Sequence, residues 1–244
     1  MKKTTLFISA LLITTIVMAQ GELDQDDKIF YRDEKTGGIN LNSNGFSLNF
    51  RYGKRLDGYN KRIYLIDLSV IKDAKEDKQL KTGYPNYGRF AYGKQNLILS
   101  LKSGMGSLHE IYSKRDKSGI SIRRFYLYGA TLAFEKPIYY EIEFQGVTTV
   151  ETFNPNIHRI DNVVGKASLF QGMDEASVIP GVYASYGYSF EYSRKKGNLK
   201  AIEIGIMGEL YLREIIIMAN DTSKPWFVTL FLTYRFGKVM SAFN

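Results

Sequence analysis

The sequence contains no cysteine and only two histidines among its 244 residues. Without cysteine the chain forms neither a disulfide framework nor a thiolate metal site. His109 and His158 lack a surrounding cluster of further ligands, so we predict no metal and no cofactor. There are five prolines and one tryptophan, against 18 tyrosines, 15 phenylalanines and 22 glycines. Many tyrosines and glycines with few prolines are typical of an antiparallel barrel.

Long apolar runs are also scarce, and the one that exists lies at the N-terminus. Lys2 and Lys3 precede an apolar stretch from Leu6 to Met18, and small or moderate residues lead up to Ala19. This pattern predicts a secretory signal peptide over residues 1–19, cleaved after Ala19. The alternative of a retained anchor is disfavoured, because a spanning helix needs about 20 apolar residues. No later segment approaches that length, so any membrane crossing must use strands.

Two segments alternate most clearly between apolar and polar side chains, namely 226–237 (WFVTLFLTYRFG) and 46–53 (FSLNFRYG). Successive side chains of a strand point to opposite faces, so each segment has one apolar face. Aromatic residues lie near the ends of these faces, as in a strand whose outer side contacts lipid. The residues predicted to face the membrane are Phe46, Leu48, Phe50, Tyr52, Trp226, Val228, Leu230, Leu232, Tyr234 and Phe236.

Similar alternation predicts seven clear strands and two short ones of uncertain assignment. The clear ones cover 46–53, 62–72, 96–112, 120–134, 181–192, 199–212 and 226–237, and the short ones 138–144 and 214–219. Bacterial single-chain barrels have even strand numbers, so we predict an all-β, antiparallel, up-and-down transmembrane β-barrel of eight strands, with ten as the alternative. A soluble lipocalin-like barrel or β-sandwich stays open, because periodicity does not say which face meets lipid.

The predicted organisation has four parts. Residues 20–44 are polar and irregular and are predicted to form a flexible leader. The barrel covers 45–238, and 239–244 form a C-terminal tail. Residues 145–178 form the longest predicted irregular connection, which is a common place for function.

Positive charge is concentrated at three predicted hairpin tips. The formal net charge is +8, or +6 without the signal peptide, and the segments 51–62, 114–124 and 194–200 each carry +4. Lysine and arginine neutralise phosphate well, so we predict that these tips contact lipid phosphates or a partner. The residues predicted to do so are Arg51, Lys54, Arg55, Lys61, Arg62, Lys114, Arg115, Lys117, Arg123, Arg124, Arg194, Lys195 and Lys196.

The alternation of connections along a meander places all three tips at one rim. The longer connections 73–94, 145–178 and 213–225 then gather at the other rim. If both chain ends are periplasmic, we expect the basic rim to face the cell exterior, where it would meet the phosphates of lipopolysaccharide. The opposite orientation, and a simple anchoring of the tips at headgroup level, stay open.

The signal peptide, the closing LTYRFGK and the paired tyrosine-rich strands resemble small outer-membrane β-barrel proteins of Gram-negative bacteria. This resemblance covers residues 45–238 and is one of architecture, porin-like or similar to the OmpA transmembrane domain. The segment 165–182 (GKASLFQGMDEASVIPGV) resembles uncharacterised members of this group. The chain ends at Asn244, so we expect no OmpA-type peptidoglycan-binding tether. The resemblance implies an outer-membrane location but assigns no residue a role.

We therefore predict a non-enzymatic protein with a structural or accessory role in the outer membrane. Its long loops would bind a protein partner of an envelope assembly or secretion complex, and its basic tips would bind lipid, including lipopolysaccharide. A narrow channel or a carrier of lipid or another small ligand is one alternative. A membrane hydrolase using His109 with Ser107 or Ser113, or His158 with Asp161, is another, although neither spacing specifies a nucleophile–base pair. An exported address and the lack of a recognition motif exclude nucleic acid as a partner.

Overall fold

In the computed structural model eight antiparallel strands close into a barrel, as predicted. The structure describes residues 32–73, 75–76, 78–79, 90–114, 119–144, 146–194, 197–219 and 223–241. The predicted signal peptide lies outside these residues. None of the helices among them is long and apolar enough to cross a bilayer. The barrel strands are β1 (Arg32–Asn42), β2 (Gly45–Arg55), β3 (Asn60–Ile71), β6 (Asn96–Tyr112), β7 (Ser121–Pro137), β11 (Ser177–Glu191), β12 (Asn198–Ile215) and β13 (Lys224–Ser241).

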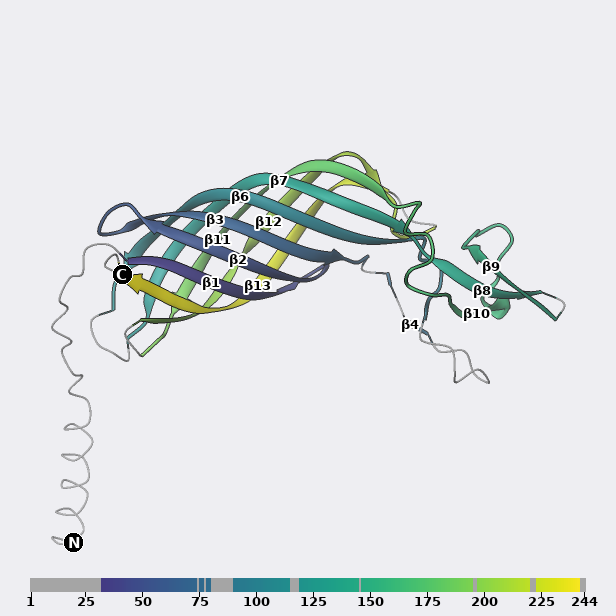
Figure 1. The fold of residues 1–244 in the computed structure, drawn as a ribbon, viewed down its shortest axis with the longest axis horizontal. Coiled ribbons are helices and arrows are strands. Elements are labelled where there is room, and N and C mark those ends of the chain that lie inside the picture. Colours follow the sequence, from purple (N-terminus) through teal and green to yellow (C-terminus); the bar gives the residue numbers. More distant parts are fainter. Residues whose placement is uncertain are drawn as a thin grey trace, which may run out of the picture.

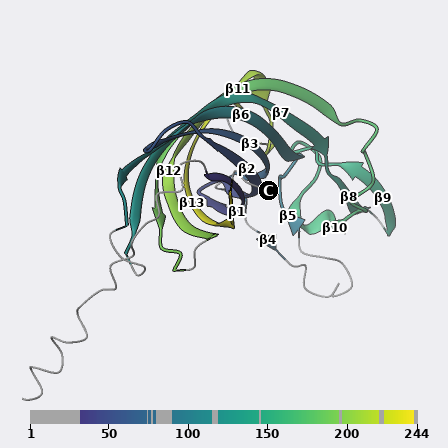
Figure 2. The ribbon, with the colours of Figure 1, turned by 60° about the vertical axis from the view of Figure 1, so that its left-hand side comes forward.

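Neighbouring barrel strands follow one another in chain order, and β1 closes the barrel against β13 (Figures 1 and 2). Their register runs from Arg32 opposite Ser241 to Asn42 opposite Phe231. β1 also pairs with β2 through a short turn that leads from Asn42 to Gly45. Closure gives every wall strand two partners, which satisfies the backbone groups that an open sheet would leave exposed at its edges.

The strand β1 corrects the prediction of a polar leader up to residue 44, because the barrel begins at Arg32. Gly37 and Gly38 interrupt its middle, and it contributes only Ile39 and Leu41 as large exposed apolar side chains. Its pairing with both β2 and β13 supplies the stability that its own apolar pattern does not. The barrel also ends slightly later than predicted, at Ser241.

The additional strand reverses the predicted orientation. β1 begins, and β13 ends, at the rim that carries the tips 56–59, 113–120 and 192–197, which we call the terminal rim. If both chain ends are periplasmic, the basic tips are therefore periplasmic as well, and not exterior. The opposite rim, which we call the cap rim, carries the connections 72–95, 138–176 and 216–223. This arrangement agrees with the short periplasmic turns and long external loops of bacterial barrels.

Residues 138–176 form a small folded unit above the cap rim, which we call the cap (Figure 1). The prediction of an irregular connection over residues 145–178 is therefore wrong. The strands in this segment are too short to produce a clear alternation, and they are stable only because they pair with one another. The cap is built around an apolar cluster in which Tyr140, Phe153 and Val163 are almost fully buried, and Phe90 from the neighbouring connection completes it. Its elements, with the adjoining ribbon, are β8 (Tyr139–Phe144), β9 (Val147–Thr152), η1 (Ile160–Asn162), β10 (Val163–Lys166), β4 (Lys78–Gln79) and β5 (Phe90–Ala91).

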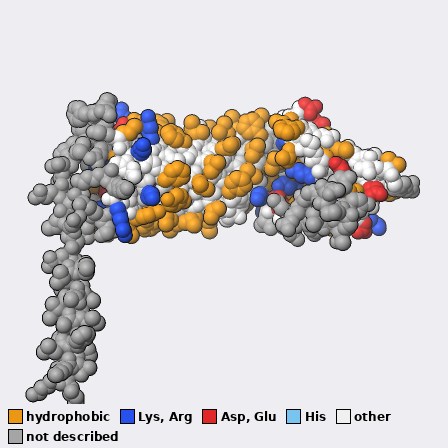
Figure 3. Space-filling view, turned by 60° about the horizontal axis from the view of Figure 1, so that its bottom comes forward, with side chains coloured by type: hydrophobic (Ala, Val, Ile, Leu, Met, Phe, Trp, Pro, Cys, Tyr) orange, Lys and Arg blue, Asp and Glu red, His pale blue; other side chains and the backbone are white. Residues whose placement is uncertain are grey.

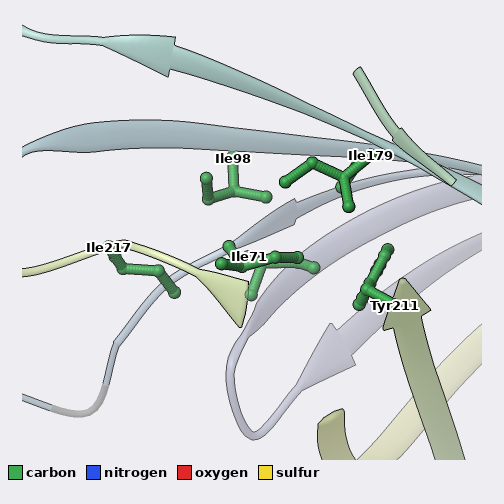
Figure 4. Close-up of a cluster of buried hydrophobic side chains, with 7 residues drawn as sticks. Ile71, Ile98, Ile179, Tyr211 and Ile217 are labelled. Atoms are coloured by element: carbon green, nitrogen blue, oxygen red, sulfur yellow. The ribbon is translucent and has the colours of Figure 1, made fainter. Parts of the chain in front are cut away.

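The barrel interior near the cap rim is filled by apolar side chains (Figure 4). Ile71, Ile98 and Ile179 come from three different strands and are at most 2% exposed. Tyr211 and Ile217 belong to the same cluster. A second apolar cluster, which includes Leu108 and Phe125, lies on the inner side of β3, β6 and β7. Dense packing of this kind closes the interior of a barrel of eight strands.

Candidate functional site: the barrel interior, the outer wall and the cap

The centre of the barrel interior holds a group of two arginines around one glutamate. Arg51 Nη1 lies 2.8 Å from Glu203 Oε1, and its Nη2 donates to Oε2 at 3.1 Å. Arg235 Nε lies 2.9 Å from the same Oε1 atom. All three side chains are no more than 6% exposed. This geometry makes the Arg51–Glu203 pair bidentate, which is the strongest form of such a contact.

Two further groups of charges continue this network. Lys102 Nζ lies 3.4 Å from Asp67 Oδ1 and 3.3 Å from Glu209 Oε1. Towards the terminal rim, Glu34 accepts from both Lys61 and Arg123, and Arg123 also pairs with Glu191. The partly exposed Lys114 adds to these three groups from the rim, and their buried members are five cations and five anions: Arg51, Lys61, Lys102, Arg123 and Arg235, with Glu34, Asp67, Glu191, Glu203 and Glu209. The charges therefore balance, as burial in a place of low dielectric requires.

An interior cavity of about 40 Å³ lies between the first two charge groups. Its lining includes Asn49, Arg51 and Tyr183, each of which has a buried polar atom without a hydrogen-bond partner. A space of this size holds about one to three waters, which would satisfy these atoms. It does not form a passage for a solute.

Three of the thirteen predicted phosphate contacts are interior ion-pair residues instead. Arg51, Lys61 and Arg123 are each less than 9% exposed and face carboxylates inside the barrel. The prediction is wrong for these three residues because side chains of a strand alternate between the two faces, and Arg51 lies between the outward-facing Phe50 and Tyr52. The same alternation turns Lys61 and Arg123 inward. The alternation along each strand is therefore the sequence signal that distinguishes basic residues on the outer wall from those in the interior.

The other described basic residues of this set lie on the outer side or the terminal rim. Lys54, Arg62, Arg124 and Arg194 are exposed. Arg55 folds back onto the carbonyl groups of its own tip, and Lys114 pairs with Glu191 at 2.9 Å. The predicted contacts Arg115, Lys117, Lys195 and Lys196 lie outside the described residues.

The outer wall carries the apolar residues that the alternation predicted to point outward. Nine of the ten are between 42% and 63% exposed, for example Phe50 and Leu230. The tenth, Tyr52, is half-buried and donates its hydroxyl to Asp33. Figure 3 shows that hydrophobic side chains predominate over the middle of the barrel on the face in view, and that Lys and Arg side chains lie towards its ends. Covering one of these apolar side chains is worth about 1.5–3 kcal/mol, so water would be a poor solvent for this wall.

The histidines have partners that do not resemble a hydrolytic site. His109 Nδ1 lies 2.8 Å from Asn60 Oδ1. His158 accepts from the Asn154 backbone N–H and lies 3.6 Å from a Glu151 carboxylate oxygen. The predicted partners Ser107 and Ser113 are not among these contacts of His109. Within the described part of the chain no group of acidic and histidine residues has the arrangement of a metal site.

The cap is acidic, in contrast to the terminal rim. Residues 138–176 contain six acidic and two basic residues, a net charge of −4 without His158. All six residues of β9 are exposed, and within the described residues β9 pairs only with β8. The Tyr140 hydroxyl holds the cap to the connection that precedes β6, since it lies 2.7 Å from the Lys94 carbonyl oxygen and 3.0 Å from that of Ala91 in β5. It is therefore a folded, negatively charged surface above a closed barrel.

We expect Tyr140→Phe to lower the stability of the cap by about 1–2 kcal/mol, because two carbonyl groups lose their hydroxyl donor. Hydrogen exchange should become faster for cap amides and stay unchanged for those of the barrel wall. Burial, with a smaller contribution from Glu76, raises the pKa of Tyr140 above its usual range. The contribution of the neutral Tyr140 hydroxyl to the stability of the cap is thus fully present below about pH 10, and it is lost as the pH rises through the raised pKa.

Tyr112→Phe provides the control, since Tyr112 is 64% exposed and lies at the terminal rim. Equal exchange rates in the cap of the Tyr140→Phe variant and of the parent would show that the hydroxyl does not hold the cap.

An apolar outer wall, a filled interior with buried charges at its centre and closed strand pairing define this protein as a small β-barrel of the outer-membrane type. No family model and no curated protein matches the chain. The solved structures that resemble it include the attachment invasion locus protein Ail of Yersinia pestis, Neisserial surface protein A, and the N-terminal β-barrel domain of Pseudomonas aeruginosa OprF.

The likeness to these structures is one of overall shape. Ail is 6% identical with a TM-score of 0.38 and is matched over 86% of this chain and 97% of its own. Neisserial surface protein A is 10% identical with a TM-score of 0.36, over 86% and 96%. The OprF domain is 7% identical with a TM-score of 0.34, over 84% and 96%. The function of this chain has to be argued from its own residues.

Proposed function

We propose that this protein is a closed, non-enzymatic barrel of the outer membrane that presents its cap to a protein partner. The observation that carries the proposal is the cap itself, a folded unit whose apolar cluster, completed by Phe90 of β5, is separate from the cluster that fills the barrel interior. A connection that served only to join two strands would not need a separate core. The barrel is the anchor in this proposal, and the cap is the part that binds.

The outer wall supports the location. Its exposed rows of aliphatic and aromatic side chains, which include Leu48, Leu230 and Trp226, suit hydrocarbon as their solvent. Lys72 lies 5.6 Å from the centre of the Phe46 ring and Lys224 lies 5.5 Å from that of Trp226. Lysines beside aromatic rings are typical of the level at which lipid headgroups begin.

The filled interior favours a role as a membrane anchor over a role as a channel. Charge groups fill the centre, and apolar side chains such as Ile98 and Ile179 fill the end below the cap. The cavity of about 40 Å³ beside Arg51 is far smaller than the space a solute would need. The histidine contacts likewise favour a binding role over a hydrolytic one.

Single cysteines test the proposal, because the chain has none of its own. Thr148→Cys places a thiol on the exposed strand β9, and Tyr59→Cys places one on a tip of the terminal rim, where Tyr59 is 64% exposed. We expect a membrane-impermeant maleimide to label Thr148→Cys on intact cells. Labelling of Tyr59→Cys should require permeabilisation of the outer membrane.

Labelling of Tyr59→Cys alone on intact cells would reverse the orientation and so contradict presentation of the cap to the exterior. The membrane location would be contradicted if neither cysteine were labelled before permeabilisation and the protein could be extracted without detergent. Heat-modifiable migration of each variant confirms that its barrel has closed.

A further inference from the structure

A groove runs along the outer wall over β2, β3, β6 and β7. Its volume is about 520 Å³, and it is open to the surroundings. Two small outward residues that face each other across the strands, Ser103 and Ala130, form the floor. Larger side chains surround the floor, with Met105 and Tyr128 paired on the side nearer the terminal rim and Phe50, Tyr52, Tyr64 and Ile66 on the strands beside it. The small pair therefore leaves a depression in a wall that is otherwise covered by large side chains.

Exposed cations lie on the same strands, on the side of the groove nearer the terminal rim. Lys54 and Arg62 form a cross-strand pair. Lys54 follows Tyr52 by two residues, and Arg62 precedes Tyr64 by two, so each cation lies on the same face as a groove residue. Arg124 has the same outward orientation on β7, four residues from Tyr128. Three positive charges thus lie above one end of an apolar groove.

We propose that this groove binds one anionic glycerophospholipid, with an acyl chain along Ser103 and Ala130 and the phosphate at Lys54, Arg62 and Arg124. The inference rests on the proposed membrane location and adds a specific ligand site to it. Lysine and arginine supply the charge complementarity, and arginine binds phosphate oxygens in a bidentate manner. The Tyr52 hydroxyl already donates to Asp33, so the headgroup is held by the cations and not by this tyrosine.

The orientation of the barrel determines which leaflet, and therefore which class of lipid, the three cations meet. The terminal rim is periplasmic if both chain ends are, so the cations lie at the headgroups of the inner leaflet, where anionic glycerophospholipid is the matching ligand. Each basic residue near a charged lipid surface strengthens binding by about fivefold. Three together predict a clear preference over a zwitterionic lipid of the same acyl chains.

The experiment uses tryptophan as a reporter, because Trp226 is the only tryptophan. In a Tyr128→Trp, Trp226→Phe protein the sole tryptophan lies at the groove. The protein is placed in vesicles that contain either brominated phosphatidylglycerol or brominated phosphatidylcholine. We expect brominated phosphatidylglycerol to quench this tryptophan with a relative binding constant at least about five times that of phosphatidylcholine. Trp226 of the parent protein, near the cap rim, should report the bulk lipid ratio.

Two kinds of variant test the site. Lys54→Gln, Arg62→Gln and Arg124→Gln together should abolish the preference, whereas the control set Arg194→Gln, Lys200→Gln and Lys238→Gln at the same rim should keep it. Ala130→Leu fills the groove and should reduce the preference with all cations intact.

Equal quenching by the two brominated lipids at residue 128 would overturn the site. A preference that survives the loss of Lys54, Arg62 and Arg124 would overturn it as well. Absence of quenching by either lipid at both tryptophans would instead contradict the membrane location, so the two proposals fail in distinguishable ways.

Discussion

Replacing Glu203 by glutamine is expected to lower the free energy of unfolding by about 3–5 kcal/mol, which is the cost of leaving a buried charge without its partner. Glu203 is 1% exposed and is the shared ion-pair partner of Arg51 and Arg235. Glutamine keeps the volume of the side chain but removes the charge, so two buried guanidinium groups would then face each other. Urea unfolding from lipid vesicles, followed by the fluorescence of Trp226, measures the effect.

The control is Glu214→Gln on the same strand, where the side chain is exposed and we expect a change within about 0.5 kcal/mol. A triple replacement, Arg51→Met with Glu203→Leu and Arg235→Met, should recover most of the loss, because an apolar core tolerates the absence of all three charges. A loss below about 1 kcal/mol for Glu203→Gln would show that the interior is hydrated well enough to solvate the arginines.

Gly106→Ala should impair closure of the barrel, with a cost of about 3 kcal/mol, the upper end of what overpacking usually causes. A Cβ atom on Gly106 would overlap the backbone carbonyl oxygen of Tyr126 and lie 2.9 Å from the Leu127 Cα. Both atoms belong to the backbone of the neighbouring strand β7, so no side-chain rotation relieves the contact. The strand pair can accept the methyl group only by separating.

Gly208→Ala is the matched control, since a Cβ atom there would meet nothing within 4 Å. We expect Gly208→Ala to fold like the parent, because alanine loses less conformational freedom on folding than glycine. The fraction of protein with heat-modifiable migration after refolding in lipid measures closure. Equal yields for Gly106→Ala and Gly208→Ala would show that β6 and β7 adjust to the methyl group at little cost.

Glu203 and Gly106 both serve the closed and filled state of the barrel, one from the interior and one from the wall. The interior has to be filled completely, and it is filled by charges that neutralise one another, as Lys102 does with Asp67 and Glu209. The wall has to stay closed, and glycines such as Gly106 allow the strands to approach. Both requirements stabilise the anchor, which leaves the cap and the groove as the surfaces available for binding.

The pattern of residues along the chain was enough to locate most of the wall. Alternation every second residue is a local property, and it placed Phe50 and Leu230 on the outer side and Asp67 and Glu203 on the inner side. It failed for β1, in which Gly37 and Gly38 and several polar side chains interrupt the apolar row. It also could not resolve the cap, whose short strands are stable only through one another and their shared core.

By itself, the sequence determined the barrel type, the outward rows and the concentration of basic residues near three tips, because each of these depends on neighbours along the chain. Tertiary structure alone decided which cations are buried, since Arg51 meets its glutamate 152 residues away. Only tertiary structure decided which rim holds the chain ends, because one additional strand moves the start of the barrel to the opposite side. The groove beside Lys54 and Arg62 likewise exists only once four strands lie in register.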